Sequence, residues 1–257
     1  MENRIAVITG AGSGIGRSAA LRLGGKGVKM VLNGRDEKKL NEVKKIIEAN
    51  GKSTDCFILP GDIAHKSTTD ACIAKCISVW QAPPDIFIAS AGRGLPGTVT
   101  SSDAEEWDDL INTNIKGLMY QLKSISHSML DRITETWDFV RQPLDIIVIG
   151  STIGHNVSPF NSVYGSTKFA AHGLTEALRR QLGPKGIRVT LIQPGLVRSN
   201  FQQSAKYNLE WFEKYAKEVG PILDADDIAK VIEFFLQLPG NINFDSISIR
   251  PTRQDYP

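Results

Sequence analysis

The stretch VITGAGSGIG, residues 7 to 16, decides the fold, because it places four glycines directly after a short apolar run. Without side chains in this turn, backbone N–H groups can approach a pyrophosphate, which then lies at the positive end of the helix that follows. The spacing is G-x-x-x-G-x-G and differs from the common G-x-G-x-x-G pattern. No Gly-Lys-Ser/Thr follows, so a nucleoside triphosphatase loop is not expected. The turn predicts a dinucleotide site between a first strand and a first helix.

Short apolar runs alternate with longer amphipathic stretches along the whole chain. Runs that are apolar on both faces are typical of a parallel sheet covered on both sides, because each crossover between parallel strands must hold a helix. We therefore expect a single-domain α/β fold with a doubly wound, Rossmann-type parallel sheet of about seven strands, flanked by helices on both faces. The predicted strands lie at residues 4–10, 28–34, 56–61, 84–92, 145–151, 187–195 and 246–251, and the predicted helices lie near 15–26, 36–50, 65–81, 103–131, 162–184 and 225–238.

The composition is that of an ordinary globular protein, with 41% hydrophobic and 23% charged residues in 257. No linker, charge run or internal repeat divides the chain, so one domain is expected over residues 1–257. Lys plus Arg number 30 against 28 for Asp plus Glu, and a net charge of +2 predicts neither a nucleic acid nor an anionic membrane as partner. A signal peptide and a membrane-length apolar run are both missing, and we expect a cytoplasmic protein.

The cysteines and histidines form no recognisable metal or disulfide pattern. Cys56, Cys72 and Cys76 are an odd set without a C-x-x-C spacing, which favours a reducing compartment. The four histidines are scattered, with no H-x-x-x-H or H-E-x-x-H spacing. We expect no metal site.

The segment 196–221 follows a predicted strand and contains the amphipathic stretch YNLEWFEKYAKEVG. It is too amphipathic for plain coil, and we interpret it as a helical lid or substrate loop. Its aromatic side chains, with others after Gly92, could build an apolar pocket. These candidates are Arg93, Leu95, Phe201, Tyr207, Trp211, Phe212 and Tyr215.

The end of the second predicted strand, VLNGRDEKKL, bears on the choice between two dinucleotides. An NAD site uses an acidic residue at this point to hold the ribose 2′-hydroxyl, whereas the 2′-phosphate of NADP requires a cation. Here Gly34 and Arg35 occupy the position, which favours NADP. Asp36 is interpreted as the N-cap of the next helix, and it keeps NAD open as the alternative.

Tyr164 and Lys168 lie four residues apart in VYGSTKFAAHG, residues 163–173. Residues at this spacing share a helix face, and an ammonium stabilises phenolate, so Lys168 is expected to lower the pKa of Tyr164 and make it a general acid and base. Ser151 follows a predicted strand thirteen residues earlier, at the same edge of the sheet as the glycine turn. Its hydroxyl could orient a substrate carbonyl. Each feature alone would be common by chance.

Together these motifs resemble the short-chain dehydrogenase/reductase family over nearly the whole chain. The matching stretches are TGAGSGIG at 9–16, GDIA at 61–64, SAG at 90–92, NTNIKG at 112–117, Ser151, YGSTK at 164–168 and QPGLVRS at 193–199. The resemblance implies a catalytic tetrad of Asn114, Ser151, Tyr164 and Lys168. In it Tyr164 exchanges the proton, Ser151 positions the carbonyl, Lys168 also binds the nicotinamide ribose, and Asn114 holds a water that links Lys168 to solvent.

The same resemblance implies a set of cofactor contacts. Asp62 would lie near the adenine, Ala91 and Gly92 beside the adenosine ribose, and the segment after Pro194 around the nicotinamide. Two positions depart from the family pattern: Ser90 replaces Asn in the NAG motif, and Ser199 replaces a frequent Thr. The expected cofactor residues are Gly10, Ser13, Gly14, Ile15, Gly16, Arg35, Asp62, Ile63, Ala91, Gly92, Tyr164, Lys168, Pro194, Gly195, Val197 and Ser199.

The function expected from these residues is an NADP-dependent oxidoreductase that moves a hydride between the nicotinamide and a small-molecule carbonyl or alcohol substrate. The alternative is a non-catalytic dinucleotide-binding regulator of the same fold. The substrate is left open among ketoacyl thioesters, sugars, steroids and small hydroxy acids. The resemblance also implies a homodimer or homotetramer formed through the long helices.

Overall fold

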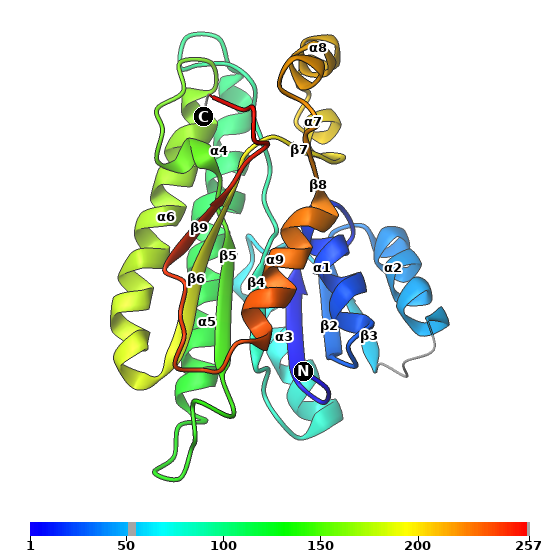
Figure 1. Ribbon diagram of the computed structural model, residues 1–257, viewed down its shortest axis with the longest axis vertical. Coiled ribbons are helices and arrows are strands. Elements are labelled where there is room, and N and C mark those ends of the chain that lie inside the picture. The colour runs from blue at the N-terminus through cyan, green and yellow to red at the C-terminus, as the bar shows by residue number, and fades with distance from the viewer. Residues whose placement is uncertain (51–54, 256–257) are drawn as a thin grey trace.

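A parallel sheet of seven strands forms the centre of the protein, in a computed structural model that describes residues 1–50 and 55–255 (Figure 1). The strand order is β3-β2-β1-β4-β5-β6-β9, which is the doubly wound arrangement expected from the sequence. All seven predicted strands are confirmed, with bounds that differ by a few residues. They are β1 (Ile5–Thr9), β2 (Lys29–Gly34), β3 (Cys56–Pro60), β4 (Ile86–Ala89), β5 (Leu144–Ile149), β6 (Ile187–Pro194) and β9 (Ser246–Ile249).

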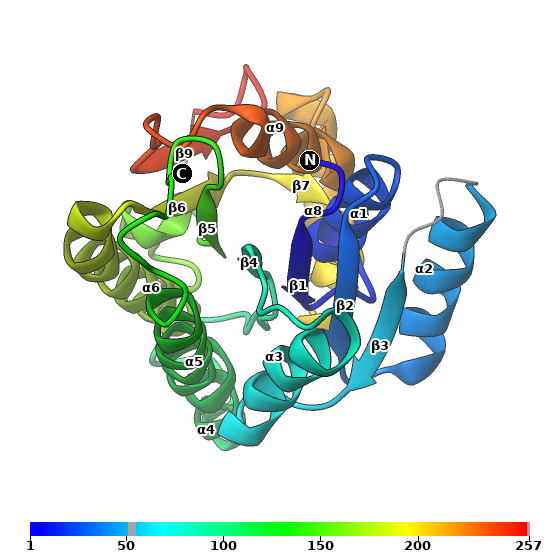
Figure 2. The same cartoon turned by 90° about the horizontal axis from the view of Figure 1, so that it is seen from below.

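Helices cover both faces of the sheet, with α1, α2 and α9 on one side and α3, α5 and α6 on the other (Figure 2). The strands are buried on both faces, so alternate residues of one strand enter different apolar layers: Ile8 of β1 packs toward α1, and Val7 packs toward the opposite layer. The flanking helices are α1 (Gly14–Gly24), α2 (Glu37–Ala49), α3 (Lys66–Trp80), α5 (Leu118–Leu130), α6 (Ser162–Leu182) and α9 (Ala225–Gln237).

The helix predicted over 103–131 is confirmed as helical backbone from Ala104 to Leu130, but it is not α-helical throughout. A 3₁₀ turn (Ala104–Glu106) leads into the short α4 (Trp107–Ile111), and a π-helical turn (Asn112–Gly117) separates α4 from α5. Gly117 lies directly on Ile63: a Cβ at Gly117 would fall 2.3 Å from Cδ1 of Ile63. The wider turn also carries Asn114, and π-turns of this kind occur frequently at functional sites.

The amino edge of the sheet is held by buried ions. Asp145 of β5 is fully buried and accepts from Nη2 of Arg4 and from Nε of Arg188, both at 2.6 Å. The Arg188 guanidinium also lies 4.4 Å from the ring centroid of Phe235 in α9. A buried charge of this kind persists only when it is paired and hydrogen-bonded. These contacts secure the amino edge of the sheet, opposite to the carboxyl ends of the strands.

At the carboxyl edge, Thr9 ties the central strands to α5. Its hydroxyl donates to Oε1 of Gln121 at 2.7 Å, and it accepts from the backbone N–H of Ala91 at 3.3 Å. Both Thr9 and Gln121 are buried. Ser90 stands where the resemblance leads one to expect Asn. It precedes Ala91, whose N–H donates to Thr9, so Thr9 and Gln121 make the hydrogen bonds that link β1, the end of β4 and α5 at this point.

The segment 196–221 folds over the carboxyl edge of the sheet, and its predicted helical character is confirmed (Figure 1). It contains α7 (Phe201–Ser204) and α8 (Leu209–Val219). A two-residue parallel ladder joins β7 (Val197–Arg198) at its start to β8 (Leu223–Asp224) just beyond its end. The helix α7 packs tightly on the loop after β4, since a Cβ at Gly94 would lie 2.7 Å from the ring of Phe201.

Candidate active site

A cavity of about 740 Å³ lies at the carboxyl ends of the strands, beneath the segment 196–221. Its walls come from the glycine turn, the ends of β4, β5 and β6, the first turns of α6, and the helices α7 and α8 of the segment 196–221. This is the edge at which ligands bind in open α/β sheets. The sequence-predicted residues that line it are Gly10, Ser13, Gly14, Ile15, Ala91, Gly92, Ser151, Tyr164, Lys168, Pro194, Gly195, Val197 and Ser199.

The glycine turn has backbone conformations that favour glycine. Gly10 and Gly14 have φ values of +65° and +52°, and a Cβ on Gly10 would lie 2.8 Å from the backbone nitrogen of Ala91. A Cβ on Gly16 would lie 2.5 Å from the carbonyl oxygen of Gly10, so Gly16 lets α1 start close behind the turn and does not line the cavity. Because these positions carry no side chains, the backbone of the turn itself forms this part of the cavity wall.

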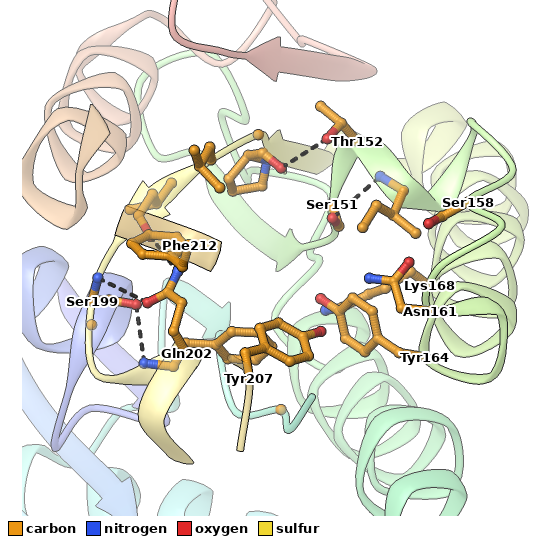
Figure 3. A pocket seen from close by; sticks show the side chains of 18 of the residues that line it. Ser151, Thr152, Ser158, Asn161, Tyr164, Lys168, Ser199, Gln202, Tyr207 and Phe212 are labelled. Atoms are coloured by element: carbon orange, nitrogen blue, oxygen red, sulfur yellow. Dashed lines mark hydrogen bonds between the residues drawn. The ribbon is translucent and has the colours of Figure 1, made fainter. Parts of the chain in front are cut away.

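Tyr164 points into the cavity from the first turn of α6, beside Tyr207 of the lid segment (Figure 3). Its side chain is buried, and its ring centroid lies 5.9 Å from that of Phe201. Burial raises the pKa of the Tyr164 hydroxyl above its ordinary value, Tyr207 raises it further, and a hydrogen bond with the Ser151 side chain lowers it. The hydroxyl is therefore protonated at neutral pH.

Lys168 lies one turn after Tyr164 on the same face of α6. Its Nζ donates to the carbonyl oxygen of Ile149 at 3.0 Å and lies 5.9 Å from the ring centroid of Tyr164. Burial lowers the pKa of Lys168 to about 8. The pKa of Tyr164 is thus raised overall and not lowered as expected, because loss of solvent favours the uncharged form of both groups; the stabilisation of a Tyr164 phenolate by Lys168 stays a prediction.

Ser151 lies just beyond the end of β5, next to Tyr164 on the cavity wall (Figure 3). It caps a 3₁₀ turn (Thr152–Gly154), and its Oγ accepts from the backbone N–H of Ile153 at 3.3 Å. Its own backbone N–H donates to Nε2 of His172 at 3.3 Å. The structure thus brings a hydroxyl, a phenol and an ammonium to one wall of the cavity.

Asn114 lies behind this wall in the π-turn, and its side chain does not line the cavity. Its Oδ1 accepts from the backbone N–H of Arg93 at 2.9 Å, and its Nδ2 donates to the carbonyl of Arg93 at 2.8 Å and to Oγ1 of Thr167 at 3.0 Å. The side chain therefore ties the loop after β4 to α6. The water-holding role implied by the resemblance stays a prediction.

Arg35, Asp62 and Ile63 lie outside the cavity wall. Arg35 is exposed at the end of β2, and Asp36 caps α2 as predicted, accepting from the backbone N–H of Lys39 at 3.1 Å. Asp62 accepts from the backbone N–H of Ala64 at 2.9 Å in the turn after β3. Ile63 is buried against Gly117.

Several lining residues were missed by the sequence analysis because they come from irregular segments. Ser158 and Asn161 lie in the loop before α6, and Gln254 belongs to the C-terminal segment. Gln254 reaches back to the lid, where its Oε1 accepts from the backbone N–H of Leu196 at 2.8 Å. One feature of the sequence could have indicated Gln254. The last predicted strand is parallel to the others, so the chain that follows it starts at the same edge of the sheet as the cavity.

The three cysteines lie inside the fold, away from the cavity. Cys56, Cys72 and Cys76 are buried, free thiols, and burial raises the pKa of each to about 12. Among the residues described, no group of three or more His, Cys, Asp or Glu side chains is placed to hold a metal ion. Likewise, no helix in the described part of the chain is long and apolar enough to cross a bilayer.

Comparison with known proteins places this site in context. A family model described as short chain dehydrogenase matches residues 4–210. Uncharacterized oxidoreductases of Staphylococcus saprophyticus and Staphylococcus aureus are 33% and 34% identical over 252 residues, covering 98% of this chain and of each relative. Among solved structures, the closed form of a serine dehydrogenase complexed with NADP⁺ is similar, with 27% identity, a TM-score of 0.85 and coverage of 98% of this chain and 96% of that one.

Proposed function

The chain belongs to the short-chain dehydrogenase/reductase family of NAD(P)-dependent oxidoreductases, and from this premise we propose that it uses NADP to interconvert a carbonyl and an alcohol, with Tyr164 as general acid and base. The observation that carries the proposal is the convergence of Ser151, Tyr164 and Lys168 on the cavity that the glycine turn also lines. A homodimer or homotetramer in the cytoplasm, with 196–221 as the substrate lid, completes the proposal.

The residues of the glycine turn fit a dinucleotide. A Cβ at Gly10 would fill the space against Ala91, so the backbone itself can meet a phosphate there. Ser13, the N-cap of α1, makes no capping hydrogen bond through its side chain with the described residues, which leaves the first-turn N–H groups without that partner. A nicotinamide dinucleotide bound here supplies or accepts the hydride.

The protein's own groups handle the proton. In the reductive direction Tyr164 gives the proton of its hydroxyl to the carbonyl oxygen as the hydride reaches the carbonyl carbon, so the alcohol forms and a phenolate remains. The raised pKa of Tyr164 keeps it in the acid form that this step requires. Ser151 hydrogen-bonds the same oxygen, and the ammonium of Lys168 stabilises the phenolate until a proton from solvent replaces the one transferred.

Arg35 supports NADP over NAD. The side chain is exposed beside the glycine turn, and within residues 1–50 and 55–255 it forms no ion pair, while the neighbouring Asp36 carboxylate is engaged in capping α2. A free guanidinium suits a 2′-phosphate, since charge-assisted pairs with phosphate are strong and often bidentate.

Replacing Arg35 by alanine is expected to weaken NADPH binding by about tenfold or more, the equivalent of a lost charge-assisted hydrogen bond, and to leave NADH binding nearly unchanged. Fluorescence titration of both cofactors measures this. Lys38→Ala removes another exposed cation three residues further along, in the first turn of α2, and serves as the matched control. Equal weakening of both cofactors, or a wild-type preference for NADH, would show that Arg35 does not select the phosphate.

The cavity supports an uncharged carbonyl substrate with an apolar body. Aromatic side chains of the lid line it, among them Phe212 and Trp211. Lys168 is the only cation among its described lining residues, and it is hydrogen-bonded to a backbone carbonyl, while Glu218 and Asp255 add two carboxylates. A substrate carboxylate would be repelled by these two carboxylates. It would also be removed from solvent without a free cation to form an ion pair with it.

A panel of matched substrates read by NADPH absorbance tests the function. Aryl and alkyl ketones, such as 4-phenyl-2-butanone, are expected to give a kcat/KM at least about tenfold above that of 2-keto acids with the same skeleton, since an unpaired carboxylate costs more than about 1.4 kcal/mol. Turnover confined to keto acids would refute the substrate class. NADPH binding without oxidation across the panel would favour the non-catalytic regulator instead.

A further inference from the structure

His172 lies one turn beyond Lys168 on α6 and faces the turn that carries Ser151. Its Nε2 accepts a hydrogen bond from the backbone N–H of Ser151 at 3.3 Å. That N–H belongs to the second residue past β5, outside the regular ladder between β5 and β6. The imidazole is therefore a side-chain partner for the backbone at the point where the chain leaves the sheet and enters the cavity wall.

Two glycines press this turn against the imidazole. A Cβ at Gly150 would lie 2.5 Å from Nε2 of His172, and a Cβ at Gly154 would lie 2.2 Å from the same atom. Real Cβ atoms do not approach so closely, so the chain before and after Ser151 fits the ring only because both positions lack a side chain. The position of the ring and the path of the turn are thus fixed together.

The hydrogen bond also fixes the protonation of His172. Nε2 can accept only if the ring is neutral with its proton on Nδ1. Burial lowers the pKa of His172 to about 4, with Lys168 on the same helix and His155 on the turn acting in the same direction and the backbone hydrogen bond with Ser151 acting against it. The His155 ring centroid is 6.1 Å away, and burial, together with Arg250 beyond β9, lowers the pKa of His155 in turn. The ring therefore remains an acceptor at neutral pH.

We propose that His172 is a positioning residue that sets the place of Ser151 in the active site through this backbone hydrogen bond; the inference rests on the proposed function. Ser151 has extended backbone angles, φ −170° and ψ 153°, and its Oγ already accepts from Ile153. The direction of the hydroxyl thus follows from where its backbone is held. Catalytic groups must be held to about half an ångström for full effect, so loosening this turn lowers kcat.

The test compares two replacements of similar size. His172→Gln places an amide oxygen near the position of Nε2 and keeps an acceptor, whereas His172→Met fills the space without one. We expect kcat for ketone reduction to fall about 10- to 100-fold in His172→Met and to stay within about threefold of wild type in His172→Gln. The Kd for NADPH is expected to remain unchanged in both. His127→Gln, at an exposed histidine of α5, is the matched control.

A double-mutant cycle separates positioning from packing. In a Ser151→Ala background His172→Met should cause no further loss of kcat, because the group it positions is gone. Should His172→Met fold poorly, His172→Asn takes its place in the cycle, since its shorter amide stops at the position of Nδ1. Equal losses in the Gln and Met variants, a Met variant as active as wild type, or additive losses in the cycle would overturn the inference. A wild-type protein without turnover would instead refute the proposed function.

Discussion

Tyr164→Phe is expected to lower kcat for ketone reduction by about 10²- to 10⁴-fold, because the substitution removes the proton donor and leaves the ring in place. The ring packs beside Phe201, with centroids 5.9 Å apart, and phenylalanine keeps this contact while losing only the hydrogen bond with the Ser151 side chain. The Kd for NADPH and the melting temperature should therefore change little. Single-turnover NADPH oxidation and fluorescence titration on the same preparation measure both quantities.

The matched control is Tyr120→Phe, which removes a hydroxyl from α5 at a position outside the cavity wall. It should leave kcat within about twofold of wild type, as surface substitutions of this kind generally do. Turnover by Tyr164→Phe at a comparable rate would mean that another group delivers the proton, and the assignment of Tyr164 would be abandoned.

Lys168→Met is expected to act in opposite directions on activity and on stability. The ammonium that stabilises the phenolate is lost, and kcat should fall by about 10²- to 10³-fold, the range seen when one charge-stabilising donor is removed. The free energy of unfolding should rise by about 1 to 2 kcal/mol at pH 7. The reason is that folding of the variant no longer removes the charged ammonium of half-buried Lys168 from solvent. Denaturant titration and steady-state kinetics give the two values.

The stability gain has a defined pH dependence. The pKa of Lys168 is lowered from 10.5 to about 8 in the folded protein, so the unfolded chain binds the proton more tightly. The destabilisation by wild-type Lys168 is full below pH 8, shrinks as pH rises from 8 to 10.5, and disappears above that. The gain from Lys168→Met should follow the same course. Lys123→Met, at an exposed lysine of α5, should show no such pH dependence, and a flat profile for Lys168→Met would contradict the argument.

Much of the fold was predictable because the decisive signals are local. A strand buried on both faces is a short apolar run, and a cap such as Asp36 is a polar side chain next to the helix that it starts. The parallel arrangement then places every strand end at one edge. This is why Ser151 and Tyr164, thirteen residues apart in the sequence, could be expected near the glycine turn before any coordinates were known.

The rest depended on three-dimensional packing. The π-turn at Asn112–Gly117 adds one residue to a helical turn, which shifts the hydrophobic period too little to be seen in the sequence. The pKa of Tyr164 is raised chiefly because the side chain is buried. The four-residue spacing between Tyr164 and Lys168 carries no information about burial. His172 was one of four scattered histidines, and its partner at Ser151 lies on another element, 21 residues away.

The ladder between β7 and β8 has a consequence for how this protein can diversify. Val197 pairs with Leu223 and Arg198 with Asp224, so the two ends of the lid leave the body side by side. Lengthening a loop whose ends are already fixed adds little closure entropy, only about 0.6 kcal/mol for each doubling. Insertions and deletions between those anchors should therefore cost little folding free energy, and under the role proposed for this segment they would change which substrates fit while Ser151, Tyr164 and Lys168 keep their places.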